Sequence, residues 1–563
     1  MERPWCLLAS IGLACSPPLT EISSAGSSGG SNSTATAPSS STSPTAGAVD
    51  DTAGTAGTAG ADGAAEGTTG NDDSDESTGA PPVDGPTYDQ VRQKSSDDCY
   101  QRDEALVDQL AYHRIRSLEF DLHVGGGGDA VNGDWLVRGG GLQGDTSCRL
   151  ISDCLAEVRA FAQAVPKHEV ITVWLDLEND WNASHSIQDL DAILQAELGD
   201  ALFGPQQLRD TCDSTDELAS IVTDPSCGWP SLGSLRGRVI AAITANGQDG
   251  IDDQLSDYLA EGTHAFVAPE IDEPAALTTA SPSYVFYNIR RQQLDTTMAV
   301  EEAGFVVRTW EANNVSDWKE TVEAGAHHVA TVRTSMHDHP WTTTHDAEGW
   351  PFECKGPCES TGPEPGTIIG IVADSNDISG TSDNMMFLHQ DLTDSPNGDW
   401  TALVSTPSSS VAEFAKGCVM ARAGLEPEAA YFAVCRPADN RPIRAQSRDE
   451  PGAGTVNNST DVAPPNTVDQ TSVAWVHLAV HSEGRCATGY AGWHRGDWVE
   501  LDTQCFDEPL VYQGLAASSL GSPPVKFLFV DPRHDDASVD TSAFVADDVG
   551  SSNGTCFDGP LPP

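Results

Sequence analysis

Four acidic residues in the first third of the chain have the type and spacing to hold a metal ion together. Asp98 lies in SSDDCY, Glu119 and Asp121 lie in SLEFDLHV, and Glu178 lies in VWLDLEND. Glu119 and Asp121 are two positions apart in a strand-like run, so their side chains point to the same face. Converging carboxylates repel one another unless a cation lies between them. Hard oxygen donors favour Ca²⁺ over Zn²⁺, which would require His or Cys.

The elements that must position these acids alternate between strand and helix from about residue 86 to 345. Strand-like runs are IRSLEFDLHV, VITVWLDLE, GRVIAAITA, HAFVAPE, GFVVRTWEA and HHVATVRT, separated by helical stretches such as RDEALVDQLAYH, SDCLAEVRAFAQAVP, SIQDLDAILQAELG and VSDWKETVEAG. Repeated β–α units predict a parallel sheet closed into a TIM-type (β/α) barrel. Because the carboxyl ends of such strands carry the active site, acids at several strand ends form one candidate group.

The regions on either side of the predicted barrel differ from it in composition. Residues 16–85 are Ser, Thr, Gly, Ala and acid, which cannot bury a core, so we expect a disordered tether. Residues 346–375 are rich in Gly, Pro and Cys and predict a linker. Residues 376–563 contain short strand-like runs, such as AAYFAVCR and KFLFVDP, which predict a smaller β-rich C-terminal module. The expected fold class is therefore α/β.

The first 15 residues predict export. An apolar run follows Arg3, and Gly12-Leu13-Ala14-Cys15 resembles a bacterial lipobox, although a Gly stands where a Leu is usual. We expect a cell-envelope lipoprotein anchored through Cys15, with an ordinary secreted protein as the alternative. No later run is long and apolar enough to predict a transmembrane span.

The remaining cysteines also suit an oxidising compartment, because most of them form near pairs in the sequence. The expected disulfides are Cys148–Cys154, Cys212–Cys227, Cys354–Cys358, Cys418–Cys435 and Cys486–Cys505. Cys99 and Cys556 are left over, and either pair with each other or leave Cys99 as a free thiol.

The charge of the chain excludes one class of partner. It has 85 Asp and Glu against 29 Lys and Arg, a formal net charge of −56. Nucleic-acid binding requires a basic footprint, so no nucleic-acid partner is expected.

The barrel region resembles the bacterial calcium-dependent, phosphatidylinositol-specific phospholipase C family over roughly residues 86–345. The likeness rests on YDQVRQK, YQRDE, IRSLEFDLHV, HEVITVWLDLEND and GFVVRT, in this order. The resemblance implies a TIM-type barrel that cleaves the glycerol–phosphate bond of an inositol lipid. In that family one histidine acts as general base, a second as general acid, and Ca²⁺ offsets charge on the phosphate.

Residue by residue, the resemblance implies a retained metal site without its histidines. Asp98, Glu119, Asp121 and Glu178 match the metal-binding positions of the family. The position of the first catalytic histidine carries Asp97. The position of the second carries Gly139, or its neighbour Gly140.

Other residues could take over part of the missing chemistry. A carboxylate such as Asp97, with an ordinary pKa near ~4, is a poor base at neutral pH. His123 shares the face of Asp121 and is a weak catalytic candidate. Arg138 is a weak candidate for phosphate binding, and its guanidinium does not release a proton readily, so it is a poor general acid. Cys99 lacks an evident basic neighbour that would activate it.

We therefore expect a phospholipase C-like phosphodiesterase-family protein that binds Ca²⁺ and is weakly active or inactive. One alternative is an active phosphoric diester hydrolase with a rearranged acid–base set, acting on a phosphoinositide or another phosphodiester lipid. Another is a cell-surface binding protein that recognises a glycan or other partner through the C-terminal module. Trp493 and Trp498 are candidates for that contact, although a core position is the more usual role for Trp.

Overall fold

The computed structural model describes residues 85–125, 133–139, 147–212, 214–245, 252–346, 349–358, 368–373, 377–407, 414–438, 441–458, 474–492, 495–496, 498–520, 524–550 and 555–558. These residues all belong to the compact unit that includes Val83–Pro563. The expected signal peptide and nearly all of the expected tether, together with Cys15, Gly140 and Trp493, lie outside the described residues.

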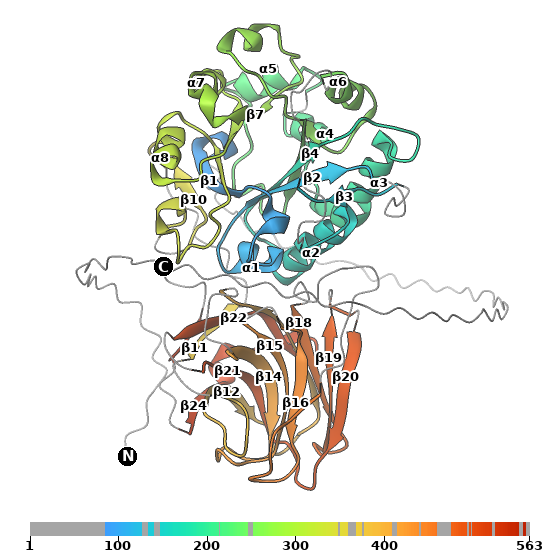
Figure 1. The fold of residues 1–563 in the computed structure, drawn as a ribbon, viewed down its shortest axis with the longest axis vertical. Coiled ribbons are helices and arrows are strands. Elements are labelled where there is room, and N and C mark those ends of the chain that lie inside the picture. The colour runs from blue at the N-terminus through green and yellow to red at the C-terminus, as the bar shows by residue number, and fades with distance from the viewer. Residues whose placement is uncertain are drawn as a thin grey trace, which may run out of the picture. The chain divides into compact units, whose positions relative to one another are not determined.

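Eight parallel strands form a nearly closed barrel, as the sequence predicts (Figure 1). They are β1 (Val91–Ser96), β2 (Ser117–His123), β4 (Ile171–Leu177), β5 (Val239–Ala245), β6 (Phe266–Val267), β7 (Phe286–Arg290), β8 (Val306–Trp310) and β9 (His328–Thr331). Their hydrogen-bonded order is β6-β5-β4-β2-β1-β9-β8-β7, and no ladder joins β6 to β7 in the part of the chain that the structure describes. Two short strands pair antiparallel with it: β3 (Leu136–Val137) with β2, and β10 (Phe352–Cys354) with β1.

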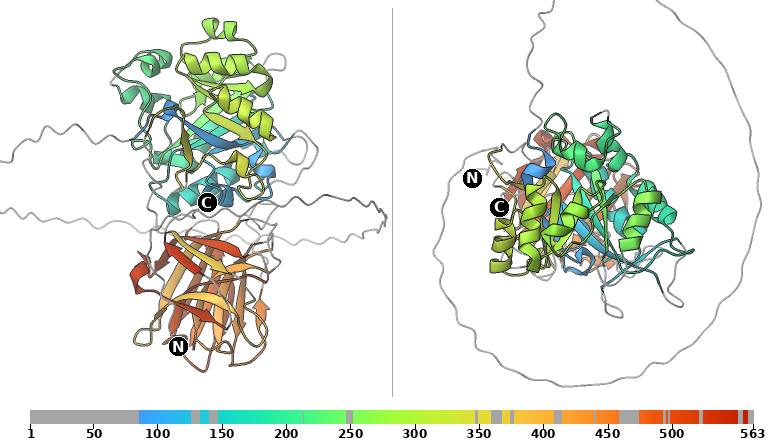
Figure 2. Two further views of the ribbon diagram at one scale, coloured as in Figure 1. Left: turned by 90° about the vertical axis from the view of Figure 1, so that its left-hand side faces the viewer. Right: turned by 90° about the horizontal axis from the view of Figure 1, so that it is seen from above.

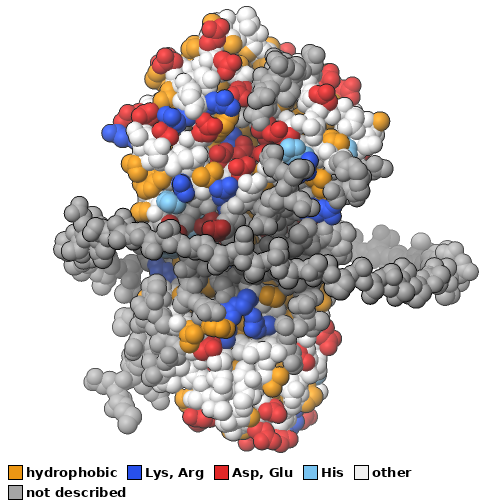
Figure 3. Space-filling model, viewed as in Figure 1, with side chains coloured by type: hydrophobic (Ala, Val, Ile, Leu, Met, Phe, Trp, Pro, Cys, Tyr) orange, Lys and Arg blue, Asp and Glu red, His pale blue; other side chains and the backbone are white. Residues whose placement is uncertain are grey.

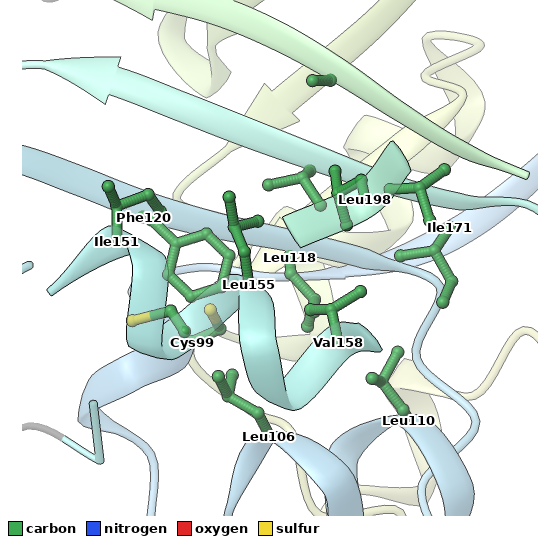
Figure 4. Close-up of a cluster of buried hydrophobic side chains, with 14 of the residues drawn as sticks. Cys99, Leu106, Leu110, Leu118, Phe120, Ile151, Leu155, Val158, Ile171 and Leu198 are labelled. Atoms are coloured by element: carbon green, nitrogen blue, oxygen red, sulfur yellow. The ribbon is translucent and has the colours of Figure 1, made fainter. Parts of the chain in front are cut away.

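Helices surround these strands on the outside (Figures 1 and 2). They are α1 (Leu106–Ala111), α2 (Ile151–Ala164), α3 (Ile187–Leu198), α4 (Pro205–Asp210), α5 (Leu218–Thr223), α6 (Asp252–Glu261), α7 (Leu294–Glu302) and α8 (Val315–Glu323). In α2 the buried residues Ile151, Leu155 and Val158 recur at helical spacing and pack against Leu118 and Phe120 of β2 (Figure 4). This apolar layer holds β2 from outside, so its alternate residues point into the barrel.

Polar side chains line the part of the barrel interior next to β1, which explains how the hydrophilic segment VRQKSS forms this buried strand. The Tyr88 hydroxyl lies 2.5 Å from Thr172 Oγ1 and 3.0 Å from His328 Nε2. His328 Nδ1 lies 2.9 Å from Ser117 Oγ, which donates to Ser95 Oγ of β1 at 2.8 Å. Because these buried groups find partners, β1 can turn polar side chains inward without the cost of unmade hydrogen bonds.

The C-terminal part is antiparallel and consists of two sheets (Figure 1). One has the order β20-β19-β18-β13-β22-β11-β25 with β23 beside β22, and the other has the order β17-β16-β15-β14-β21-β12-β24. The strands are β11 (Ile368–Ala373), β12 (Met385–Asp391), β13 (Gly398–Ser405), β14 (Lys416–Arg422), β15 (Tyr431–Pro437), β16 (Arg444–Arg448), β17 (Val456–Asn458), β18 (Trp475–His481), β19 (Cys486–Gly492), β20 (Trp498–Cys505), β21 (Tyr512–Ser518), β22 (Val525–His534), β23 (Ala537–Ser538), β24 (Val545–Val549) and β25 (Thr555–Asp558). Apolar residues from both sheets share one core cluster, so this part is a β-sandwich.

All five expected disulfides are formed, which is typical of an exported protein. Cys99 is a free and buried thiol. The side chain of Cys556 lies outside the described residues. Trp498 is half-buried, with its ring 4.8 Å from that of His477. No described helix combines the length and the hydrophobicity that a membrane crossing requires.

Candidate metal centre

Two neighbouring strands supply the acids of the candidate site. Asp97 and Asp98 directly follow β1, and Glu119 and Asp121 lie in β2, which pairs parallel with β1. Glu119 and Asp121 alternate with apolar residues that face the outer layer, so both acids point inward. Figure 3 shows acidic side chains gathered at the middle of the barrel.

Asp98, Glu119 and Asp121 form a compact group of possible cation ligands. One carboxylate oxygen of each lies within 4.8 Å of the others. Asp98 adopts a left-handed backbone conformation (φ 48°), which lets its amide donate to Glu119 Oε2 at 3.1 Å. Tyr100 Oη donates to Asp98 Oδ1 at 3.0 Å. The turn after β1 thus directs the Asp98 carboxylate toward those of β2.

The electrostatics of this group fit a divalent cation. Burial, together with the charges of Asp98 and Glu178, raises the pKa of Asp121 to about 8. Burial, followed by the charge of Asp97, also raises the pKa of Asp98. Without a bound cation these carboxylates therefore take up protons readily. A bound cation would lower their pKa values and keep them ionised as ligands. Because the donors are hard oxygens without His or Cys, the residues present fit Ca²⁺.

Glu178 lies near this group without joining it. Its backbone amide donates to Leu122 O at 3.1 Å, which places it just beyond the end of β4. Its charge acts on both Asp121 and His123. Its carboxylate, however, is not among the three whose oxygens lie within 4.8 Å of one another.

A buried arginine, Arg308, contacts the carboxylates of the site. It was not among the site residues predicted from the sequence. Arg308 of β8 is fully buried, and its Nη2 lies 2.7 Å from both Asp97 Oδ1 and Glu119 Oε2. Its Nη1 donates to Asn288 Oδ1 at 2.8 Å, and its guanidinium lies 5.7 Å from the centre of the Trp174 ring. One signal was available: a cation at an inward position of the apolar run GFVVRT requires an acidic partner when buried.

The sequence resemblance implies catalytic histidines at positions 97 and 139. In the structure, Asp97 is hydrogen-bonded to another side chain, and the space beside Gly139 is filled. The Asp97 carboxylate accepts a hydrogen bond from Arg308. Gly139 follows β3, and a Cβ atom built on it would overlap Nε2 of Gln101. Gln101 therefore lies where the side chain of a residue at position 139 would begin.

His123 and Arg138 both lie near the carboxyl end of β2. His123 is 9% exposed, and its Nε2 has no hydrogen-bond partner. Burial lowers the pKa of His123, against the opposing charge of Glu178. The Arg138 amide approaches Asp121 O at 3.4 Å, so Arg138 follows β3 directly beside the acidic strand. The structure brings both residues to the same end of the barrel as the carboxylate group.

Cys99 points away from this group. Its side chain lies in the apolar cluster between α1, α2 and β2 (Figure 4), and its Sγ donates to Glu119 O at 2.9 Å. Burial, followed by the nearby carboxylates, raises the pKa of the Cys99 thiol. A buried thiol that resists ionisation is not placed to act as a nucleophile.

No family model matches this chain, and no curated protein matches its sequence. Among solved structures, a calcium-dependent phosphoinositol-specific phospholipase C from the Gram-negative bacterium Pseudomonas sp. is 19% identical. The match covers 44% of this chain and 91% of that one, with a TM-score of 0.38. A Ca²⁺-dependent phosphatidylinositol-specific phospholipase C from Streptomyces antibioticus is also 19% identical, covering 45% and 96%, with a TM-score of 0.38.

A glycerophosphodiester phosphodiesterase from Parabacteroides distasonis is 10% identical, covering 44% of this chain and 96% of that one, with a TM-score of 0.27. The two phospholipases are of the class that the sequence motifs resemble. The barrel assignment itself rests on strand order and register, and the site rests on the contacts described above.

Proposed function

We propose that this protein is a phospholipase C-like phosphodiesterase-family protein that binds Ca²⁺ through Asp98, Glu119 and Asp121 and hydrolyses phosphodiesters weakly or not at all. The observation that supports the proposal most directly is the ion pair between Asp97 and Arg308. The residue at the expected base position is held by a buried guanidinium, and the expected acid position is Gly139.

The chemistry explains why this arrangement should be slow. Attack of a hydroxyl on phosphorus needs a base near the attacking oxygen and an acid near the leaving oxygen. Each such group contributes roughly 10²–10⁴-fold to the rate. Asp97 Oδ1 accepts a hydrogen bond from Arg308 Nη2, and Gly139 has no side chain that could act as an acid. Asp98, Glu119 and Asp121 would hold the Ca²⁺, and the bound ion would stabilise negative charge on a phosphate. Neither the ion nor its ligands would replace the missing base and acid.

Calcium binding is tested on the full chain by calorimetric titration. We expect one Ca²⁺ to bind the wild-type protein, and Asp121→Asn to weaken binding by roughly tenfold or more, because ligand charge sets affinity. Asp257→Asn is the matched control, because Asp257 is exposed on α6. Absence of Ca²⁺ binding by the wild-type protein would reject the proposed site.

Activity is tested by the release of inositol phosphate from phosphatidylinositol vesicles, and by an aryl phosphodiester, with Ca²⁺ and then with chelator. We expect little Ca²⁺-dependent turnover. Turnover that Asp97→Asn abolishes would contradict the proposal, since it would make Asp97 a working base.

Restoring the family histidines tests the cause of the low activity. The variant Asp97→His/Gly139→His/Gln101→Ala replaces both histidines and removes the side chain that fills the space at position 139. We expect its Ca²⁺-dependent hydrolysis to exceed that of wild type by about 10²-fold or more. Gln101→Ala alone is the control. A folded, Ca²⁺-binding triple variant no faster than wild type would place the cause elsewhere.

The second candidate function is an active hydrolase that uses His123 as its base. The observation that favours it is the free Nε2 of a nearly buried imidazole at the same end of the barrel. Burial keeps this imidazole neutral, as a base must be. Ca²⁺-dependent turnover lost in His123→Gln but retained in Asp97→Asn would establish this candidate instead.

We also propose that the protein is anchored to the cell envelope through a lipidated Cys15. The five disulfides support export, and the Gly12–Cys15 segment supports the anchor. Cys15→Ser should release the protein from the membrane fraction of expressing bacteria. Equal membrane association of both forms would contradict the anchor.

A further inference from the structure

The carboxyl ends of β7 and β8 present an arginine whose charge is not used inside the fold. These strands pair parallel, with Asn288 opposite Arg308 and Arg290 opposite Trp310. Asn288 and Arg308 face the barrel interior, since they bond to each other and Arg308 reaches Glu119. Residues two positions further along a strand share that face. Arg290 and Trp310 therefore point to the same side, one step nearer the end where the carboxylates gather.

Arg290 is held in place by stacking rather than by an acid. Its guanidinium carbon lies 4.5 Å from the centre of the Trp310 ring. Arg290 Nε and Trp310 Nε1 are both buried and without a hydrogen-bond partner. The structure shows no ion pair for Arg290 among the described residues. The next residue, Arg291, is the opposite case: its Nη1 lies 3.1 Å from Asp317 Oδ1 and 3.4 Å from Glu320 Oε2 on α8.

A guanidinium stacked on an indole keeps the N–H groups along its edge free. Those donors match two oxygens of a phosphate at once, and stacking reduces the side-chain entropy lost on binding. Asp97, Asp98, Glu119 and Asp121 would repel an anion at this end of the barrel. A bound cation would reduce this repulsion, and an unpaired arginine would attract the anion whether or not the cation is present. Arg290 is such an arginine.

We propose that Arg290, braced by Trp310, is the anion-binding residue of the barrel mouth and binds a phosphate group of the substrate. This inference rests on the proposed function for the identity of the substrate as a phosphodiester. The phosphate is either the one in the diester or a phosphate ester on the head group, and both have the same chemistry for a guanidinium.

Calorimetric titrations of the full chain with two soluble probes distinguish these sources. The probes are glycerophosphoinositol, which has only the diester, and glycerophosphoinositol 4-phosphate, which has an additional ester. We expect Arg290→Gln to weaken the binding of at least one probe by roughly tenfold or more, the usual loss for a charge-assisted hydrogen bond. Weakening of both probes assigns Arg290 to the diester phosphate. Weakening of the second probe alone assigns it to the head group.

Three variants separate anion binding from structural effects. Arg291→Gln removes a neighbouring arginine that already has acidic partners, so it should bind both probes as wild type does. Trp310→Phe keeps an aromatic face and should retain most of the affinity, whereas Trp310→Leu should lose it. Arg290→Lys keeps the charge but loses the paired N–H donors of the guanidinium. Its affinity for the probes should lie between those of wild type and Arg290→Gln.

Each titration is repeated in EDTA. The two buffers together distinguish a failure of the proposed Ca²⁺ site from a failure of the proposed anion site. If the wild-type protein binds no Ca²⁺ but Arg290→Gln still weakens probe binding in EDTA, the proposed cation site fails and the anion site stands. Equal binding by Arg290→Gln, Arg291→Gln and wild type, or no probe binding by the wild-type protein in either buffer, overturns the inference.

Discussion

Arg308 sets the charge of the candidate metal centre before any cation binds. When ionised, Asp97, Asp98, Glu119 and Asp121 are four negative charges against its one positive charge. A divalent cation reduces this excess to a single charge, which explains why the unliganded group protonates readily and why a doubly charged ion suits it. The remaining excess is still unfavourable to a phosphate anion. Binding of a substrate phosphate therefore depends on cations outside this group.

Single buried histidines give the fold a predictable response to acid, and His168 is the clearest case. It is fully buried beside Glu169, and burial, followed by the Arg116 guanidinium, lowers its pKa from 6.5 to about 4. The unfolded chain therefore binds a proton that the folded chain does not between these pH values. This stabilisation is complete above about pH 6.5 and is lost as the pH falls toward 4. It amounts to about 3 kcal/mol.

The measurement is urea unfolding of the full chain at pH 7.5 and pH 4.5. His168→Asn keeps an N–H that can donate to Glu169 O but has no titrating ring, so its stability should fall less between the two pH values. His481→Asn is the matched control, because this imidazole is exposed on β18. An acid response in His168→Asn as large as that of wild type would contradict the assignment.

At the residue scale, the sequence identifies the donors but not the partners that tune them. Glu119 and Asp121 are recognisable because period-two alternation in an apolar strand fixes their face. The ion pair between Asp97 and Arg308 joins residues 211 positions apart, and it depends on β9 lying between β8 and β1. Gln101 filling the space beside Gly139 depends on the path of two loops. Neither contact leaves a local signal in the sequence.

At the scale of elements, α1 holds the turn that presents Asp98. Gln109 is fully buried, and its Nε2 donates to Cys99 O at 2.7 Å and to Glu104 O at 2.8 Å, the two ends of the segment between the metal-binding turn and the helix. Both acceptors are backbone carbonyls, so the helix fixes the path of the turn rather than one side chain. The Asp98 conformation depends on this path.

Gln109→Leu should therefore loosen the turn without touching a metal ligand. Loss of two buried hydrogen bonds should cost about 1–3 kcal/mol in the free energy of unfolding. Ca²⁺ affinity should fall by up to about tenfold, the equivalent of ~1.4 kcal/mol. Urea unfolding and calorimetry measure the two effects. Gln188→Leu, at an exposed position on α3, is the control and should change neither. Unchanged stability and affinity in Gln109→Leu would show that α1 does not fix the turn.

The elements themselves were predictable where their pattern follows the usual rule for a parallel barrel. Apolar runs such as VITVWLDLE and GRVIAAITA become β4 and β5, because both faces of these strands are buried. β7 was not foreseen, because its inward residues Asn288 and Arg290 are polar and break the apolar run. β1 is also polar, and its side chains bond across the barrel interior. Strands that line a functional interior are those whose pattern is least typical.

At the scale of the whole described unit, the barrel and the β-sandwich share one core. Leu106 and Tyr112 from the α1 region belong to the same apolar cluster as Leu403 of β13 and Trp475 of β18. A buried ion pair crosses this cluster. The sequence could not foresee it, because it joins α1 to a strand more than 300 residues later, and local patterns carry no information about such a pairing.

The ion pair joins Asp108 of α1 to Arg436 of β15, and both residues are nearly fully buried. Two parallel hydrogen bonds of 2.8 Å connect them, and Asp108 Oδ1 also accepts from Ser405 Oγ and from the Thr406 amide at 2.9 Å. Removing either partner leaves an uncompensated buried charge, which typically costs about 3–5 kcal/mol.

Asp108→Asn and Arg436→Met should therefore each strongly lower the free energy of unfolding of the full chain, whereas the double variant should lose less than the sum of the two. Urea unfolding of the four proteins measures this coupling. The same cycle on Lys319 and Glu323, an exposed pair on α8, is the control and should give a coupling of at most ~0.5 kcal/mol.

Because Asp108 adjoins Gln109, which holds the metal-binding turn, the single variants should also weaken Ca²⁺ binding, and the double variant should recover part of it. Additive stability losses would mean that the β-sandwich and the barrel are joined without this pair, and Ca²⁺ affinity independent of Asp108 would mean that the sandwich does not help to position the metal centre.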